Sequence, residues 1–379
     1  MASIFTEKYA NFDLSTGAND GSSEADAWKT PAAVIAGVAA GNRVNIKRQS
    51  SAYNLTSSVD FNVSGTALAP IYYRAYTSTI GDGGIWECAY NAGGIADLYF
   101  SGNYNYVEGV NYKPGASTNL NSFRVNGAHS WAIRCKADIR VSVGYIANAR
   151  RCWFIAGSSG AYFNISGGNS YNVDVEECVF QRVGSTSTAY LAYSDQYARA
   201  LNIRNCVFIG NGNSGEDALY LYRPANHSVV GVHGSRFYNF DDGIHVNDEP
   251  TTNKQTSLIS RCLFDTMAGY AVKRNAGTDL GKVRIADCFY RACTSGFSNY
   301  IDAADLAAFG IEAHSGNPFV DASTFDMEMD TTSGEGQAVR DKEYVIDPTG
   351  VNTMKIQPFG AWWKVPSGGS GGGAMVIGG

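Results

Sequence analysis

Residues 203–208 read IRNCVF, and the chain repeats this hexapeptide in variant form. The copies are VEECVF (175–180), VHGSRF (232–237), ISRCLF (259–264) and IADCFY (285–290). With one earlier cysteine, the central positions are Cys152, Cys178, Cys206, Ser235, Cys262 and Cys288. The steps between them are 26, 28, 29, 27 and 26 residues. A period of this size indicates stacked supersecondary units, none of which can bury its apolar face alone.

The pattern inside each copy is that of a strand. An aromatic residue stands two positions after the central residue, as Phe208 follows Cys206, so both side chains face one way. An apolar residue stands three positions before it, as Ile203 does, and this odd spacing predicts a bend just ahead of the cysteine. The polar or small residues at the expected bend are Glu177, Asn205, Gly234, Arg261 and Asp287.

A second strand recurs in each repeat. The segment DDGIHVND (241–248) aligns with EDALYLYR (216–223) and MAGYAVKR (267–274). This alignment stacks Leu219 with Ile244 and Tyr270, and Leu221 with Val246 and Val272. We therefore predict an all-β fold, a single-stranded right-handed parallel β-helix with about 27 residues per coil and coils roughly 4.8 Å apart.

The β-helix also accounts for the cysteines. A small apolar side chain that stacks on its own copy suits the interior, and free cysteine behaves as a buried hydrophobe. The chain has no CxxC pair, so a disulfide framework or a metal site is the less favoured reading. Cysteines kept reduced are typical of a protein made in the cytoplasm.

The composition narrows the classes of function. The chain has 379 residues, 17% charged, with a formal net charge of -6. This composition argues against an electrostatic nucleic-acid binder, which would normally carry a basic patch, and no apolar run is long enough to cross a membrane. Residues 1–17 lack the basic start and apolar core of a signal peptide, so we expect synthesis in the cytoplasm.

The ends of the solenoid need covers, because open sheet edges invite association. Residues 30–39 predict a short capping helix, with Thr30 as N-cap and Pro31 at the first helical position, and Gly41 follows it. We divide the chain into an N-terminal arm and capping helix (1–42), the β-helix (43–300), C-terminal coils and cap (301–365), and a glycine-rich tail with an apolar tip (366–379).

Three segments resemble those of pectin-lyase-like right-handed β-helix proteins of bacteria and phages. They are residues 17–47, residues 65–84 (GTALAPIYYRAYTSTIGDGG) and residues 317–336 (NPFVDASTFDMEMDTTSGEG). The family often has proline after the last of these, where this chain has Gln337. The resemblance implies the fold, but it does not fix a function, because this fold carries lyases, hydrolases, adhesins and phage spikes alike.

The sequence allows two interpretations of the tail at residues 366–379. Its glycine–serine run is typical of a disordered linker. Alternatively its apolar tip, Ala374, Met375, Val376 and Ile377, docks on a partner by adding a strand to a sheet edge. In the second reading the tail joins this chain to other virion proteins.

Four residues are candidates for catalysis: Asp217, Asp241, Asp242 and His245. Two carboxylates with a histidine suit general acid–base chemistry. On the same expected edge lie Glu216, Arg223, Asp248, Lys273 and Arg274. No cofactor and no metal site are expected, although a lyase would use the carboxylate pair for Ca²⁺.

The segment DDGIHV (241–246) resembles the paired-aspartate strand of polygalacturonases. In that family Gly-His-Gly follows the pair, whereas here VHGS (232–235) precedes it, so no catalytic role is carried over. An Asp-Asp-Gly run also suits a simple turn.

Tyr190, Tyr193, Tyr220 and Tyr222 are candidates for a carbohydrate-binding strip, or else are ladder residues or subunit contacts. The favoured reading is a structural or receptor-facing virion protein, a phage fibre, spike or capsid decoration. It would form a homo-oligomer, with a trimer favoured by resemblance, and could bind a surface glycan. The alternative is a polysaccharide depolymerase, either a lyase or a glycoside hydrolase.

Overall fold

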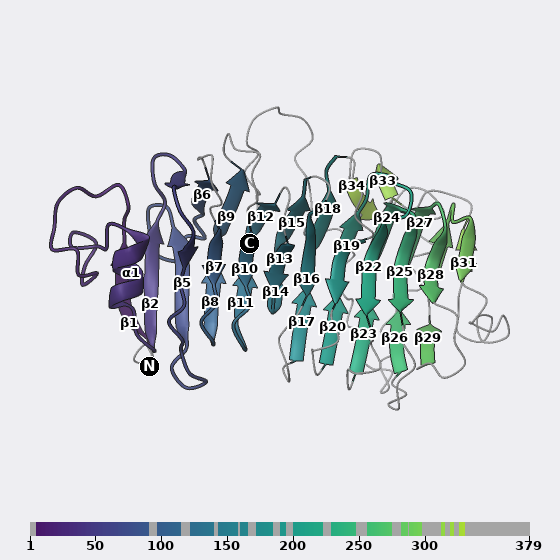
Figure 1. Cartoon of the computed structure of the whole chain (residues 1–379), viewed down its shortest axis with the longest axis horizontal. Helices are drawn as coiled ribbons and strands as arrows, with labels where there is room; N and C mark the ends of the chain where they lie inside the picture. The colour runs from purple at the N-terminus through teal and green to yellow at the C-terminus, as the bar shows by residue number, and fades with distance from the viewer. Residues whose placement is uncertain are drawn as a thin grey trace, which may run out of the picture.

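The computed structural model describes residues 5–90, 97–114, 122–139, 143–157, 160–165, 172–184, 190–194, 200–222, 229–247, 256–274, 282–286 and 288–297. It also describes the strand backbone of 312–314, 319–321 and 326–329. These residues form the predicted all-β solenoid, whose coils stack along the long axis of the molecule from α1 at one end to β31 at the other (Figure 1). No described helix has the length and apolar character needed to cross a membrane.

Each coil contributes one strand to each of three parallel sheets, rather than the two strands expected from the repeat. Counted over the described residues, here and for the next two sheets, sheet A has 11 strands: β1 (Thr6–Ala10), β2 (Asn42–Lys47), β5 (Ile71–Tyr76), β8 (Asn105–Glu108), β11 (Trp131–Ile133), β14 (Asn148–Arg150), β17 (Asn172–Glu176), β20 (Ala200–Arg204), β23 (Val229–His233), β26 (Thr256–Ser260) and β29 (Lys282–Ala286). Sheet B has 11: β3 (Tyr53–Leu55), β6 (Trp86–Tyr90), β9 (Val110–Pro114), β12 (Lys136–Ile139), β15 (Trp153–Ala156), β18 (Val179–Arg182), β21 (Val207–Ile209), β24 (Arg236–Phe240), β27 (Leu263–Met267), β30 (Phe289–Arg291) and β32 (Glu312–His314). Sheet C has 10: β4 (Val59–Asp60), β7 (Leu98–Phe100), β10 (Phe123–Val125), β13 (Val143–Ile146), β16 (Tyr162–Ile165), β19 (Tyr190–Ser194), β22 (Asp217–Tyr222), β25 (Asp242–Asn247), β28 (Tyr270–Arg274) and β31 (Ser295–Phe297).

The repeated hexapeptide turns the corner between sheets A and B. In the copy IRNCVF, β20 ends at Arg204 and β21 begins at Val207. Between them Asn205 has φ 54°, a left-handed conformation that redirects the chain. The same conformation recurs just before the central position of other copies, at Arg151, Glu177, Gly234 and Arg261. The bend predicted from the three-residue spacing is thus confirmed. It is made by one residue in the left-handed conformation.

The central residues form an interior ladder, as predicted. Cys152, Cys178, Cys206, Ser235, Cys262 and Cys288 are all fully buried, and the cysteines are free thiols. The ladder also takes in Cys135, whose backbone N–H donates to Cys152 Sγ at 3.3 Å. The thiol of Cys206 donates to the carbonyl of Arg204 at 3.4 Å, so the buried polar group keeps a partner within its own corner.

A ladder of stacked rings runs beside the cysteines. Phe208 lies between Phe180 and Phe237, with centroid separations of 5.0 Å and 4.7 Å and nearly parallel planes. Phe264 continues the stack at 4.9 Å from Phe237. Because each coil repeats at the strand spacing, identical residues stack on one another, and this explains why the sequence repeats them.

The predicted register of the second strand is right for one pair of coils and wrong for the next. Leu219 pairs with Ile244, and Leu221 with Val246, as expected. Ile244 however pairs with Val272 rather than Tyr270. The prediction was off by two residues, and a shift of two leaves every side chain on the same face, so alternation could not reveal it.

The N-terminal end carries the helix α1 (Pro31–Gly37), in which the Thr30 side chain accepts from the N–H of Ala33 at 3.1 Å. The helix is shorter than the predicted 30–39. It ends because Val38 is extended and its side chain is buried in the core. Within the segment expected to be an arm, β1 pairs with β2 and forms the first strand of sheet A.

Beyond the coils, β33 (Phe319–Asp321) and β34 (Asp326–Met329) pair antiparallel. Residues 366–379, including the predicted docking tip, lie outside the described residues.

Candidate functional site

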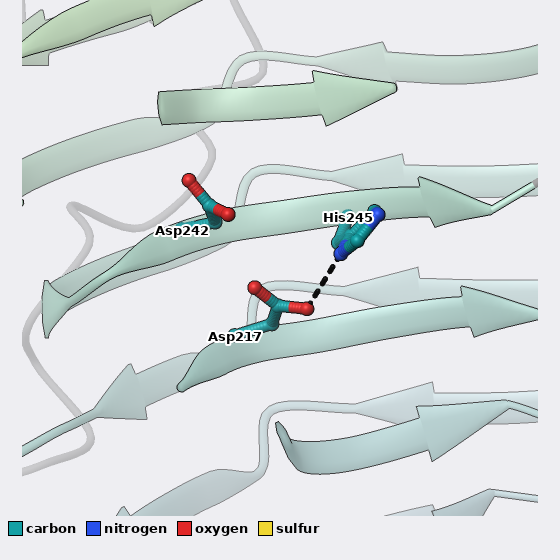
Figure 2. Close-up of side chains that lie close together, drawn as sticks. All are labelled: Asp217, Asp242 and His245. Carbon is teal, nitrogen blue, oxygen red and sulfur yellow. Dashed lines mark hydrogen bonds and ion pairs between the residues drawn. The ribbon is translucent and has the colours of Figure 1, made fainter. Parts of the chain in front are cut away.

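The predicted catalytic residues lie where the chain enters sheet C. Asp217 is the first residue of β22 and Asp242 the first of β25, and the two are directly paired in adjacent strands. His245 is on β25 and pairs with Tyr220 of β22. Both pairings were predicted from the sequence and are confirmed. Figure 2 shows His245 pointing from its strand towards Asp217 on the neighbouring one.

A short hydrogen bond joins the histidine to one carboxylate. His245 Nδ1 lies 2.7 Å from Asp217 Oδ2 (dashed line in Figure 2). The side chains are 12% and 7% exposed, so the contact is largely shielded from water. A carboxylate bound to Nδ1 fixes the orientation of the ring.

The other carboxylate is held by the next coil. Asp242 Oδ2 accepts from Lys273 Nζ at 2.7 Å, and Oδ1 accepts from the backbone N–H of Tyr270 at 2.7 Å. The side chain of Asp242 is 3% exposed, whereas that of Lys273 is 36% exposed. Both oxygens of Asp242 are therefore occupied by hydrogen bonds, and the side chain of Lys273 is partly exposed at the surface.

Burial and charge shift the pKa values in this cluster in different directions. Burial raises the pKa of Asp217 to about 6, and the charge of Asp242 adds to the rise, while the hydrogen bond and charge of His245 oppose it. For Lys273, burial lowers the pKa, but the hydrogen bond and charge of Asp242 outweigh it, so the pKa is raised. At neutral pH the site thus holds a firmly charged ammonium beside a carboxyl that titrates near neutrality.

Asp241, the fourth predicted residue, serves a turn. Its Oδ2 accepts from the backbone N–H of Gly215 at 2.8 Å, and it is not among the side chains that converge on His245. Two of the flanking residues named from the sequence, Arg223 and Asp248, lie outside the described residues.

A buried ion pair between Arg182 and Glu216 lies next to the site. Glu216 was named from the sequence, whereas Arg182 was not. Arg182 Nε donates to Glu216 Oε1 at 2.6 Å, and both side chains are at most 1% exposed. Arg182 also donates to the carbonyl of Ala161, and the Glu216 carbonyl accepts from the N–H of Asp241. Glu216 precedes Asp217, so the Arg182–Glu216 pair fixes the backbone from which the Asp217 carboxylate projects. Arg182 lies 34 residues away in a different sheet, and no repeat signal marks it.

A strip of partly exposed tyrosines leads to the site along sheet C. Tyr193 stacks on Tyr220 at 5.8 Å, and Tyr190 lies 5.0 Å from Tyr193. Tyr220 meets the edge of His245 at 4.8 Å, and Tyr222 lies 6.0 Å from Tyr193. The four predicted tyrosines therefore form one continuous surface next to the Asp217–His245 pair.

The same cluster is a candidate cation site by the types of its side chains. Ligand atoms of Asp217, Asp242 and His245 lie within 4.8 Å of one another. Ca²⁺ takes six to eight oxygen ligands, whereas this cluster offers two carboxylates, one bound to the Lys273 ammonium and the other to His245. The residues present do not fit a resident Ca²⁺, because Lys273 already supplies the compensating charge.

No family model and no curated protein matches the sequence. Among solved structures, the chain is similar to the pectate lyase Pel9A, with 15% identity, 85% of each chain covered and a TM-score of 0.49. It is also similar to the PL6 family alginate lyase AlyGC, with 12% identity and a TM-score of 0.44. That match covers 85% of this chain but 42% of the lyase, so this chain spans less than half its length. A mannuronic acid specific family 6 lyase from human gut microbiota gives 12% identity, coverages of 84% and 89%, and a TM-score of 0.36.

Proposed function

We propose that this chain is a polysaccharide lyase that cleaves an acidic glycan laid along the outer face of sheet C. The observation that carries the proposal is the hydrogen-bonded Asp217–His245 pair, which lies one coil from the exposed ammonium of Lys273 and at the end of a tyrosine strip.

The pair supplies a base. A histidine whose ring is oriented by a buried carboxylate can act as a general base, and the carboxylate stabilises the imidazolium that forms. In a β-elimination, His245 takes the proton from the carbon next to a uronate carboxylate. The electron pair left behind forms a carbon–carbon double bond, the adjacent glycosidic C–O bond breaks, and the departing oxygen takes up a proton from water.

Lys273 supplies the positive charge that this step needs. Removing a proton beside a carboxylate builds negative charge on that carboxylate, and a fixed cation stabilises it. Lys273 is paired with His245 in adjacent strands, so its ammonium stands one coil from the base. Its raised pKa keeps it charged, which suits this role and not that of a base.

Hydrolysis fits the geometry less well. A glycoside hydrolase needs two carboxyl groups, one to protonate the leaving group and one to attack or to activate water. Both oxygens of Asp242 are hydrogen-bonded, to Lys273 and to the Tyr270 backbone, and its side chain is 3% exposed. It is held as an ion partner and is poorly placed to act on a sugar.

The tyrosine strip would bind the sugar rings. Aromatic faces pack against apolar patches of a ring while their hydroxyls keep a polar contact. Tyr193 and Tyr220 offer two such faces at successive coils.

The test is an activity screen on polygalacturonate, alginate and a neutral dextran, with the unsaturated product followed by its ultraviolet absorbance. The wild type should release this product from an acidic polymer and leave dextran intact, and His245→Ala should be inactive. His233→Ala is the matched control, because it removes a half-buried histidine from sheet A. The lyase proposal would be rejected if both variants kept wild-type activity. It would also be rejected if the wild type released saturated reducing ends.

The place of the protein on a virion, its trimer and the docking tail remain predictions from the sequence. A lyase acting on host surface glycans is compatible with them, and none of the described residues tests them.

A further inference from the structure

One register position can be followed through eight neighbouring strands of sheet C, from β7 to β28; beyond β7 it continues to Asp60 of β4, whose carboxylate accepts from Ser101 Oγ. From strand to neighbouring strand it holds Tyr99, Arg124, Tyr145, Asn164, Tyr193, Tyr220, His245 and Lys273. The base and the cation of the proposed site are the last two members. The position thus defines a track parallel to the solenoid axis that continues well past the tyrosine strip.

Arg124 is the cation at the other end of this track. Its guanidinium carbon lies 4.4 Å from the ring centroid of Tyr99 and 4.5 Å from that of Tyr145. Two stacked rings hold the planar group and reduce its freedom. Arg124 Nε also donates to Ser122 Oγ at 3.1 Å.

This guanidinium has no acidic partner among the residues that the structure describes. The nearby carboxylate of Asp97 is engaged elsewhere: it accepts from the Tyr99 hydroxyl at 2.5 Å and from the Ser122 N–H at 2.8 Å. Several arginines on the solenoid surface are paired with acids, for example Arg134 with Glu108 and Arg204 with Glu176. A rigid, partly exposed arginine without a counter-charge is suited to bind an external carboxylate, sulfate or phosphate.

We propose that Arg124, clamped between Tyr99 and Tyr145, is a distal subsite that binds an anionic group of the polysaccharide processed at His245. The inference rests on the proposed function. Five strand-to-strand steps separate β10 from β25 (β13, β16, β19, β22, β25), so the subsite lies about 24 Å from the base at roughly 4.8 Å per step. A substrate must therefore be an oligosaccharide of several acidic residues to reach both.

The experiment compares Arg124→Gln with Arg284→Gln, which removes the same charge from an exposed position on sheet A. Both variants are checked for wild-type circular dichroism and thermal midpoint. Cleavage of size-fractionated oligogalacturonates and oligoalginates is then measured at low and high salt. We expect Arg124→Gln to raise KM about tenfold or more for fragments longer than the 24 Å span, with kcat unchanged and Arg284→Gln silent. Short fragments should be cleaved equally by all three proteins.

Each outcome decides a different point. If the wild type cleaves long acidic fragments and Arg124→Gln matches it, the subsite is refuted while the proposed function stands. An increase in KM that is the same for short and long fragments also refutes it, because the effect would then be non-specific electrostatics. If the wild type neither binds nor cleaves either acidic polymer, both the subsite and the lyase fail. A tenfold length-dependent increase in KM, weakened by salt, supports the subsite.

Discussion

Replacing Asp217 with asparagine should stabilise the fold at neutral pH and remove catalysis at the same time. The pKa of Asp217 is raised from 3.8 to about 6, chiefly by burial. The folded protein therefore binds this proton more tightly than the unfolded chain does. For an acid raised in this way, stability falls as pH rises from the ordinary pKa to the folded one.

The magnitude follows from the pKa. A rise of this size corresponds to about 3 kcal/mol of unfolding free energy lost once the carboxyl is ionised. Asparagine has the shape of the protonated acid but cannot ionise. Asp217→Asn should thus match the wild type near pH 4, gain on it between pH 4 and 6, and exceed it by up to about 3 kcal/mol above that.

The assay is urea unfolding of both proteins from pH 4 to 8, with Asp241→Asn as a control for removing a charge from the same corner. In parallel, wild-type kcat/KM should rise through about pH 6 as Asp217 ionises, and Asp217→Asn should lose on the order of 10²–10⁴ in kcat. A variant less stable than the wild type at pH 8, or a stability difference that does not change with pH, would show that ionisation of Asp217 does not destabilise the fold. It would mean that burial of the ionised Asp217 carboxylate does not lower the free energy of unfolding.

Three further results are expected. Treatment with EGTA should leave activity intact, because Lys273 and not Ca²⁺ balances Asp242; loss of activity restored by Ca²⁺ would contradict this. Phe208→Ala should lower the free energy of unfolding by about 3–5 kcal/mol, since it removes the ring between Phe180 and Phe237; a loss below about 1 kcal/mol in urea titrations would argue against the stack. The ladder cysteines should resist a thiol reagent until the protein is denatured, and Cys206→Phe should cost about 1–3 kcal/mol by overpacking, whereas rapid native labelling would place them outside.

The fold could be predicted from the sequence because each coil stacks on its own copy. A side chain such as Cys206 must fit both the coil before and the coil after, so the same residue type recurs at the same step. The bend at Asn205 was visible for the same reason, as an odd spacing that repeats with the cysteine.

The features that were missed carry no such repetition. The pairing of Ile244 with Val272 differs from the predicted one by two residues, and side-chain alternation is blind to that shift. This error concealed that Lys273 stands opposite His245. The helix α1 ends early because Val38 is extended and buried, and the Trp28 ring packs where a side chain at residue 37 would lie. Arg182 forms its ion pair with Glu216 of another coil, and Arg124 packs on tyrosines of the neighbouring coils. The role of neither arginine could therefore be predicted from the residues next to it in sequence.

We propose that sheet C binds an acidic glycan along its outer face and that the glycan is cleaved at His245. The most direct measurement is a crystal structure of the His245→Ala protein soaked with an acidic oligosaccharide that the wild type cleaves. We expect sugar rings on Tyr193 and Tyr220, with one carboxylate at Lys273 and another, towards the N-terminal end, at Arg124. Sugar bound on sheet A or B, with sheet C bare at saturating ligand, would contradict it.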